Sequence, residues 1–256
     1  MTTKILSVIT QKGGVGKTTS TIHIGGCLAE KGYKVLLIDF DTQMNLSQGY
    51  NVEDFSYNVE DFLEGKISPK FTQKGIGNNV YIISGSSTIR EKKYNKYTLK
   101  KAIEGLKGNF DFVLIDCPPK PIVDDDLTLG EIAVNASDYV ISPIKADKFS
   151  LIGIETLLNA INKLKITGLK ANVLGFFFNE VEQQTNHFKE YYSALNESSA
   201  NNFLIKEFIR KDVNIKNAME EGKTIFEVRP YGRASQDFRK LTDEILNKIE
   251  EYEQEN

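Results

Sequence analysis

The chain has 256 residues, 40% of them hydrophobic, and a formal net charge of −3. A chain of this length buries a sizeable core, and we expect one α/β domain over residues 1–256. No apolar run is long enough to span a membrane, and the first residues lack the pattern of a signal peptide. Two cysteines and two histidines exclude a disulfide framework and a zinc knuckle. We therefore expect a cytoplasmic protein whose two cysteines are buried.

Strand-like runs alternate with helical segments along the chain. The strand-like runs cover residues 4–10, 35–39, 80–84, 112–116, 139–144 and 173–178. The helical segments cover residues 17–31, 99–107, 150–164, 187–195 and 235–252. Buried apolar strands that are separated by crossover helices pair in parallel. The order predicts a mostly parallel, twisted β-sheet with helices on both faces.

A glycine-rich loop, QKGGVGKTT, follows the first predicted strand and precedes the first predicted helix. Gln11 stands where the usual G-x-x-x-x-G-K-[ST] pattern has its first glycine, and the extra lysine Lys12 follows it. The backbone N–H groups of Gly13, Gly14, Val15 and Gly16 are expected to point at phosphate oxygens, next to the positive end of the helix dipole. In this pattern, Lys17 reaches the β- and γ-phosphates, Thr18 binds Mg²⁺ and Thr19 contacts the α-phosphate. The loop therefore predicts a site for a nucleoside triphosphate with Mg²⁺.

Three aspartates follow buried strands. Asp116 ends the run FVLID, where a carboxylate holds Mg²⁺ through a water molecule in a Walker B site. Asp39 and Asp41, in LLIDFDTQMNLS, lie at the carboxyl end of a parallel strand, the edge at which such sheets bind ligands. Taken alone, this D-x-D is equally consistent with a solvated turn. Together with the glycine loop, it favours a nucleotide site.

These motifs, in this order, resemble the ParA/MinD family of P-loop ATPases, which have a deviant Walker A loop. KGGVGKTT, LLIDFDTQMNLS and FVLIDCPP all match, and the resemblance continues through SPIKADKFSLIGIETLL and FIRKDVNIKNAMEEGKTI to the last helix. It implies a slow, Mg²⁺-dependent ATPase that dimerises around ATP. In the family, the lysine at the position of Lys12 contacts the phosphates bound by the partner subunit. The position of Asp41 orients the attacking water and belongs to the metal site, and Asp39 supports the metal's outer shell.

The rest of the chain discriminates among the branches of this family. A MinD-like protein ends in a basic amphipathic helix that binds membranes, whereas this chain ends in IEEYEQEN, which an anionic bilayer repels. The positions of Cys27 and Cys117 do not suit an iron–sulfur cluster shared between subunits. We therefore expect a DNA-partitioning ATPase without stable membrane binding. A MinD-like positioning ATPase and a biosynthetic phosphotransferase remain the alternatives.

Partition ATPases bind DNA without sequence preference, which requires surface cations. One basic cluster lies at Arg90–Lys101 and another lies toward the C-terminus. The family's DNA surface is largely C-terminal, so the second cluster is favoured, although a solvated helix face explains each of its residues equally well. The expected DNA-binding residues are Lys206, Arg210, Lys211, Lys216, Arg229 and Arg233, with Arg239 and Lys240 nearby. Many family members read I-P-R at Ile209–Lys211, and this chain lacks that proline.

The remaining expectations concern adenine and the protein partners. Asn179 ends a strand where relatives place a polar side chain on the base, although an asparagine that caps a turn is an equally good account. The first strand begins near Lys4, so the chain resembles the small ParA type that lacks an N-terminal helix-turn-helix domain. That type leaves specific DNA recognition to a centromere-binding partner, a ParB-like or ribbon-helix-helix protein. Because the resemblance implies dimerisation around ATP and nonspecific DNA binding, we expect a homodimer that associates with the nucleoid.

Overall fold

A seven-stranded sheet forms the centre of the computed structural model, which describes residues 2–66, 71–75, 79–120, 122 and 126–255. Its strand order is β3-β4-β2-β5-β1-β6-β7. The strands are β1 (Lys4–Val8), β2 (Val35–Asp39), β3 (Thr72–Lys74), β4 (Val80–Ile83), β5 (Phe112–Asp116), β6 (Tyr139–Ile144) and β7 (Asn172–Phe178). All pairs are parallel except β3 with β4 at one edge. The predicted, mostly parallel sheet is confirmed, and β3 is the strand that the sequence did not indicate.

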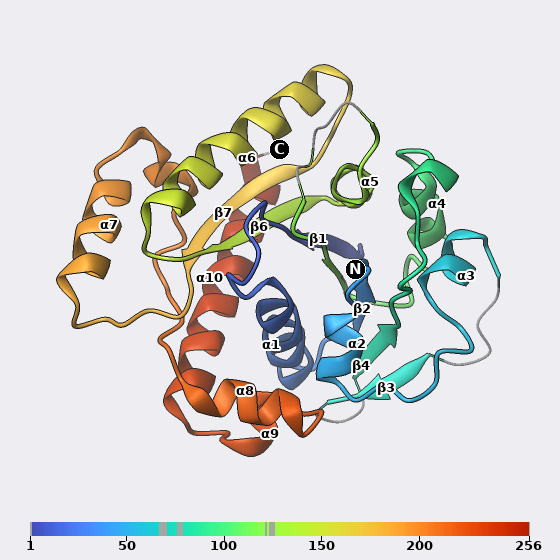
Figure 1. The fold of residues 1–256 in the computed structure, drawn as a ribbon, viewed down its shortest axis with the longest axis horizontal. Coiled ribbons are helices and arrows are strands. Elements are labelled where there is room, and N and C mark those ends of the chain that lie inside the picture. Colours follow the sequence, from blue (N-terminus) through green and yellow to red (C-terminus); the bar gives the residue numbers. More distant parts are fainter. Residues whose placement is uncertain (1, 67–70, 76–78, 121, 123–125, 256) are drawn as a thin grey trace.

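Helices cover both faces of the sheet (Figure 1). One face carries α1 (Lys17–Glu30), α2 (Asn45–Gly49), α8 (Val213–Glu220), α9 (Ile225–Val228) and α10 (Arg233–Glu255). The other carries α3 (Val59–Leu63), α4 (Thr98–Glu104), α5 (Leu129–Ala136), α6 (Lys148–Ile166) and α7 (Asn186–Asn196). Two 3₁₀ turns, η2 (Glu91–Lys93) and η3 (Ser199–Phe203), complete the described elements. The five predicted helices correspond to α1, α4, α6, α7 and α10, with ends shifted by up to three residues.

The alternating side chains of each strand supply two separate hydrophobic cores. In β2, Leu36 and Ile38 pack with the α3–α7 layer, whereas Val35 and Leu37 pack with α1 and α10. All four are completely buried. A strand covered on both faces therefore reads as a continuous apolar run, because both of its sides need hydrophobic residues. Cys27 and Cys117 are buried too, as predicted.

The sheet topology brings the predicted motifs to one edge. Strands β2, β5 and β1 are neighbours and run parallel, so their carboxyl ends lie together. Asp39 and Asp116 are direct partners in the β2–β5 register, and Val8, at the end of β1, is the partner of Asp116 on the other side. The glycine loop follows Val8 within a few residues. The glycine loop, Asp39 and Asp116 therefore lie together at the carboxyl ends of these three strands.

In the part of the chain that the structure describes, no helix is both long and apolar enough to cross a membrane.

Candidate functional site: a phosphate-binding loop with buried carboxylates

Two glycines give the loop between β1 and α1 its shape. Gly14 and Gly16 have φ values of 70° and 92°, in the left-handed region that side chains disfavour. A Cβ atom at Gly16 would lie 2.0 Å from the Asn179 amide nitrogen, so this position excludes any larger residue. That nitrogen donates a 2.8 Å hydrogen bond to the Val15 carbonyl. Asn179, at the end of β7, thus holds the loop, a contact that the sequence did not reveal.

Lys17 is the first residue of α1 and is buried, with 7% of the residue exposed. Burial lowers the pKa of its amine, while the nearby Asp116, Cys117 and Asp41 raise it. The lysine lines the same pocket as Gly14, Gly16, Thr18 and Thr19. A cation that is fixed in this position is suited to binding phosphate oxygens.

Asp116 is fully buried beside the first turn of α1. The Thr18 hydroxyl donates to one carboxylate oxygen at 2.7 Å, and the Thr21 hydroxyl lies 3.5 Å from the other. Burial raises the pKa of Asp116 to about 8, and the neighbouring Asp39 carboxylate adds to this rise. The hydrogen bond from Thr18 and the charge of Lys17 act in the opposite direction. A divalent cation at this position would supply the positive charge that a buried carboxylate lacks.

Asp39 and Asp41 have different surroundings. The backbone N–H and the hydroxyl of Ser47 donate to one oxygen of Asp39 at 2.9 and 2.6 Å. The other oxygen is buried and has no hydrogen-bond partner among the described residues. Burial raises the pKa of Asp39 to about 6, against the hydrogen bonds from Ser47. Asp41, which is 5% exposed, lines the pocket directly and accepts a 3.0 Å bond from the Gln43 N–H.

These oxygen donors fit Mg²⁺. The Thr18 hydroxyl and the Asp116 carboxylate are hard ligands at the end of the phosphate loop, and Asp41 faces the same pocket. In the described part of the chain, no group of three or more His, Cys, Asp or Glu residues is arranged to hold a metal ion alone. Mg²⁺ is typically bound by one or two carboxylates together with the phosphates of a nucleotide. The site therefore fits a magnesium–nucleotide complex rather than a metal ion bound only by protein.

Lys12 is directed away from this pocket. Its amine lies 2.5 Å from an Asp147 carboxylate oxygen and 5.6 Å from the centre of the Phe149 ring. Asp147 caps α6, and Phe149 is 71% exposed. Burial alone would raise the pKa of Asp147, but its hydrogen bonds with Lys12 and the Ser150 N–H lower it overall. Lys12 does not line the pocket that contains Lys17, so the two lysines of the loop face different directions.

The pocket next to the loop has a volume of about 820 Å³ and extends from the phosphate loop to α8. Its lining includes Asn179, Arg210 and Lys211, together with Gln48 and Asn51. Ile215 and Met219 of α8 add apolar surface. A polar phosphate end and a partly apolar far end suit a nucleotide. Arg210 and Lys211, predicted as DNA-binding residues, thus border the nucleotide pocket.

Four of the six predicted DNA-binding side chains already have protein partners. Arg210 makes a bidentate ion pair with Asp237, whose carboxylate also accepts from the Arg210 N–H. Lys211 pairs with Glu182, Lys216 pairs with Glu220, and Arg233 donates to the Lys211 carbonyl and lies 3.7 Å from Asp212. The side chains of Lys206 and Arg229 make no hydrogen bond or ion pair with the residues that the structure describes. The six cations are therefore not equivalent.

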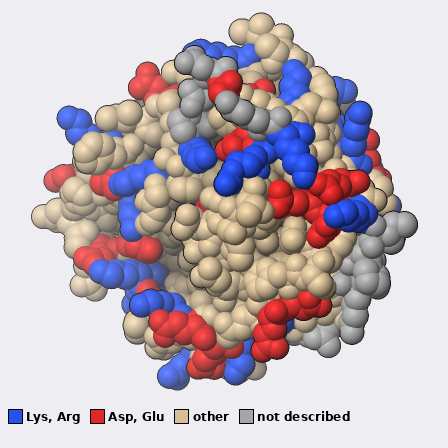
Figure 2. Space-filling model, turned by 45° about the vertical axis from the view of Figure 1, so that its right-hand side comes forward, with Lys and Arg blue, Asp and Glu red and all other residues tan. Residues whose placement is uncertain are grey.

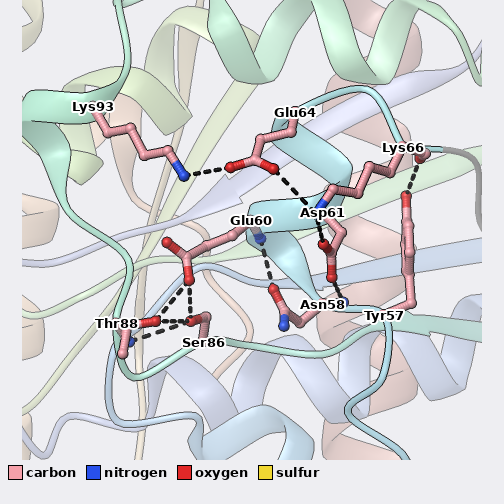
Figure 3. A network of polar contacts seen from close by, with 9 residues as sticks. All are labelled: Tyr57, Asn58, Glu60, Asp61, Glu64, Lys66, Ser86, Thr88 and Lys93. Carbon is pink, nitrogen blue, oxygen red and sulfur yellow. Dashed lines mark hydrogen bonds and ion pairs between the residues drawn. The ribbon is translucent and has the colours of Figure 1, made fainter.

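The other basic cluster, Arg90–Lys101, lies beside an acidic helix. Figure 3 shows Lys93 and Lys66 directed toward Glu64, while Glu60 accepts from the hydroxyls of Ser86 and Thr88. Lys93 is thus already paired. In the view of Figure 2, several lysine and arginine side chains gather next to the grey atoms with acidic side chains beside them, and the others are interspersed with acidic ones.

Sequence reasoning missed four residues that shape the site: Ser47, Thr21, Asp147 and Asp237. Ser47 lies within the quoted motif LLIDFDTQMNLS, so its polar character was the only available signal. Asp147 and Asp237 reach their basic partners across 135 and 27 residues of sequence, respectively. Such pairs depend on tertiary packing and leave no local pattern.

Comparisons with known proteins show the family to which the chain belongs. A family described as an AAA domain matches residues 3–174, more than half of the chain. The chain is 29% identical to the chromosome-partitioning ATPase Soj of Treponema pallidum, over 95% of the chain and 97% of that protein. It is 28% identical to a ParA family protein of Chlamydia trachomatis, with the same two coverages.

A solved structure has the same fold. The septum site-determining protein MinD of Pyrococcus horikoshii, in complex with Mg-ADP, superposes with a TM-score of 0.71 at 27% identity and covers 95% of the chain and 96% of that structure. With its parallel sheet, its phosphate loop and these relatives, the chain belongs to the ParA family of P-loop ATPases.

Proposed function

We propose that this ATPase partitions DNA: ATP with Mg²⁺ joins two copies into a dimer, the dimer binds DNA without sequence preference, and hydrolysis releases it. The observation that carries the proposal is the direction of Lys12. Lys17 lies in the nucleotide pocket, whereas Lys12 lies outside it, partly exposed and paired with Asp147. A partly exposed lysine outside the pocket is available to the phosphates of a second subunit.

Within one subunit, the pocket residues divide the work on ATP. The N–H groups of Gly13, Gly14 and Gly16 and the Lys17 amine bind the phosphates, and Thr19 lies at the α-phosphate. Thr18 and Asp116 would hold Mg²⁺, which would neutralise phosphate charge. Lys12 of the other subunit adds a second cation to the same phosphates. Offsetting the charge that develops on these oxygens lowers the barrier to hydrolysis.

Asp41 is proposed to orient the attacking water. Of the three strand-end aspartates, Asp41 is the one that lines the pocket, and the Gln43 N–H donates a hydrogen bond to its carboxylate. Asp39 is fully buried and accepts two hydrogen bonds from Ser47, so it acts on the metal site through its neighbours. Carboxylates are weak general bases, so hydrolysis is slow and the ATP-bound dimer persists.

The DNA surface is proposed to lie on the C-terminal elements α8–α10 and the segment before them. Its cations are Lys206, Arg210, Lys211, Lys216, Arg229 and Arg233. Lys206 and Arg229 are free to bind phosphates, whereas Lys211, Lys216 and Arg233 are exposed and would exchange weak surface pairs for DNA phosphates. Arg210 belongs to this surface mainly as a support, because its guanidinium is held by the buried Asp237.

The partner proposed to stimulate hydrolysis is a centromere-binding ParB-like or ribbon-helix-helix protein. The relative from Treponema pallidum is named as a chromosome-partitioning ATPase, which supports a role in segregation. A nucleoid location follows from DNA binding in the ATP state. The proposal treats residues 1–256 as one ATPase domain.

DNA binding in different nucleotide states tests the proposal. We expect a fluorescently labelled duplex of arbitrary sequence to bind with ATP and Mg²⁺, to dissociate with ADP, and to bind more weakly as salt rises. Equal binding with ATP and ADP, or none with either, would overturn the proposal. The similarity to MinD makes a membrane-positioning ATPase the second candidate. ATP-dependent binding to anionic vesicles without DNA binding would favour that candidate, although the final turns of α10 carry Glu250, Glu251, Glu253 and Glu255.

A further inference from the structure

The segment Arg229–Arg233, RPYGR, forms a tight turn between α9 and α10, at the end of the molecule where these helices meet α8 (Figure 1). The Gly232 N–H donates to the Arg229 carbonyl at 2.8 Å, which closes a four-residue β-turn. Proline in the second position and glycine in the fourth are favoured in such a turn. Tyr231 occupies the third position and is 88% exposed, the most exposed of the large hydrophobic residues that the structure describes.

Side chains of α10 hold this turn rigidly. Ser235, which is fully buried, donates to the Arg229 carbonyl at 2.6 Å. Arg239 donates to the Pro230 carbonyl at 2.6 Å, and Gln236 donates to the Tyr231 carbonyl at 3.2 Å. Arg239 is itself fixed by two 2.6 Å bonds to Glu30 of α1. Three successive carbonyls of the turn are therefore held, and the tyrosine ring is presented on a fixed backbone.

The two ends of the turn are basic. Arg229 is exposed and its side chain has no ion pair among the described residues, and Arg233 is exposed on the other side. Arg233 also donates to the carbonyl of Lys211, which borders the nucleotide pocket. An exposed aromatic ring between two arginines has the chemistry of a nucleic-acid contact, because the arginines bind phosphates while the ring packs on sugars and base edges.

We propose that Tyr231 is a direct DNA contact, an apolar and sequence-tolerant one placed between two phosphate-binding arginines. The inference rests on the proposed DNA binding and deepens it. Two contributions to DNA affinity are therefore expected. Arg229 and Arg233 supply affinity that depends on salt, and Tyr231 supplies affinity that is nearly independent of salt. A merely solvated tyrosine would need neither three carbonyl supports nor flanking cations.

The first test compares salt dependence. With ATP and Mg²⁺, we expect Tyr231→Ala to weaken duplex binding about tenfold at every salt concentration, with the slope of log affinity against log salt unchanged. Tyr231→Phe should retain most of the affinity, because the ring makes the contact. Arg229→Ala should instead reduce the slope by about one. Thermal unfolding confirms that each variant is folded, as expected for exposed residues. Unchanged affinity in Tyr231→Ala would overturn the inference while leaving the proposed function intact.

The second test is a fluorescent reporter. The chain has no tryptophan, so Tyr231→Trp creates a single probe at the turn, and Tyr97→Trp creates a matched one beside the other lysine cluster. We expect DNA added with ATP to change the emission of the first probe and not of the second. A change only at Tyr97→Trp would overturn the inference and move the DNA surface to Arg90–Lys101. If wild-type protein binds no DNA in any nucleotide state, the proposed function itself fails.

Discussion

The phosphate-loop pocket and the C-terminal basic surface use charged residues in opposite ways. In the pocket, Lys17 and Asp116 are buried and have shifted pKa values, because burial penalises their charged forms. On the C-terminal surface, Lys211 and Lys216 are exposed and pair with nearby acids. A buried charge that its neighbours compensate only in part marks a group suited to binding a ligand. Exposed ion pairs, in contrast, contribute little to the stability of the fold. The pocket therefore contains buried charges that a ligand would compensate, whereas the cations of the proposed DNA surface are exposed and would have to exchange acidic partners for phosphates.

The largest expected effect separates chemistry from binding in the pocket. Replacing Asp41 by alanine should reduce the rate of ATP hydrolysis by about 10²-fold or more, since a positioned carboxylate no longer orients water. ATP affinity should change little, because Lys17 and the loop N–H groups remain. Steady-state turnover and nucleotide binding measure the two effects. Asp54→Ala, which removes an exposed carboxylate outside the pocket, is the control, and loss of ATP binding in Asp41→Ala would contradict the assigned role.

Lys12 tests whether the pocket is complete within one subunit. Lys12→Ala should bind ATP as a monomer with nearly wild-type affinity but form no ATP-dependent dimer, and turnover should fall by about 10²-fold. Sedimentation with ATP reports the dimer. Lys148→Ala is a matched control, since Lys148 is an exposed lysine at the start of α6, next to Asp147. Normal hydrolysis by Lys12→Ala would show that the lysine does not act across an interface.

Arginines of the basic surface are expected to differ in how much they stabilise the fold. Asp237 is buried, and its carboxylate accepts three hydrogen bonds, all from Arg210, among the described residues. Arg210→Ala should therefore lower the free energy of unfolding by about 2 kcal/mol, less than for a completely buried pair because Arg210 is partly exposed. Arg229→Ala should change it by no more than about 0.5 kcal/mol and still weaken DNA binding. Denaturant unfolding and DNA titrations make the comparison. If Arg210→Ala is fully stable yet loses DNA binding, Arg210 is a contact and not a support.

The same two regions show which features of the fold and the site could be predicted from the sequence. The phosphate loop and Asp116 were predictable because their chemistry demands particular residues next to particular elements. The Arg210–Asp237 pair was not, since nothing in the sequence around Arg210 indicates that a residue of α10 will accept its guanidinium. Helices α2 and α9 have five and four residues, too few to establish an apolar period. The parallel strands were predictable because burial on both faces makes them continuous apolar runs, whereas the short, partly exposed β3 was not.

The smallest expected effect concerns the structural link between the two regions. His23, in α1, is completely buried: its Nδ1 lies 2.8 Å from the Thr19 carbonyl, and its ring stacks on Phe238 of α10 with centres 4.8 Å apart. Burial lowers the pKa of His23 from its usual 6.5 to about 4. Between these values the unfolded chain binds a proton that the folded chain does not, so stability falls as pH decreases.

For His23, this linkage amounts to about 1 kcal/mol between pH 7 and pH 5.5. Burial also raises the pKa of Asp39 and Asp116, which act with the opposite sign, because the folded chain then holds protons that the unfolded chain releases. The readout is therefore the difference between wild type and His23→Phe, which keeps a ring on Phe238 but cannot titrate. We expect the unfolding free energy of the wild type to fall by about 1 kcal/mol more than that of the variant over this range. Parallel pH profiles would mean that His23 is protonated or hydrated in the folded protein, and that the contact between α1 and α10 is looser than this packing implies.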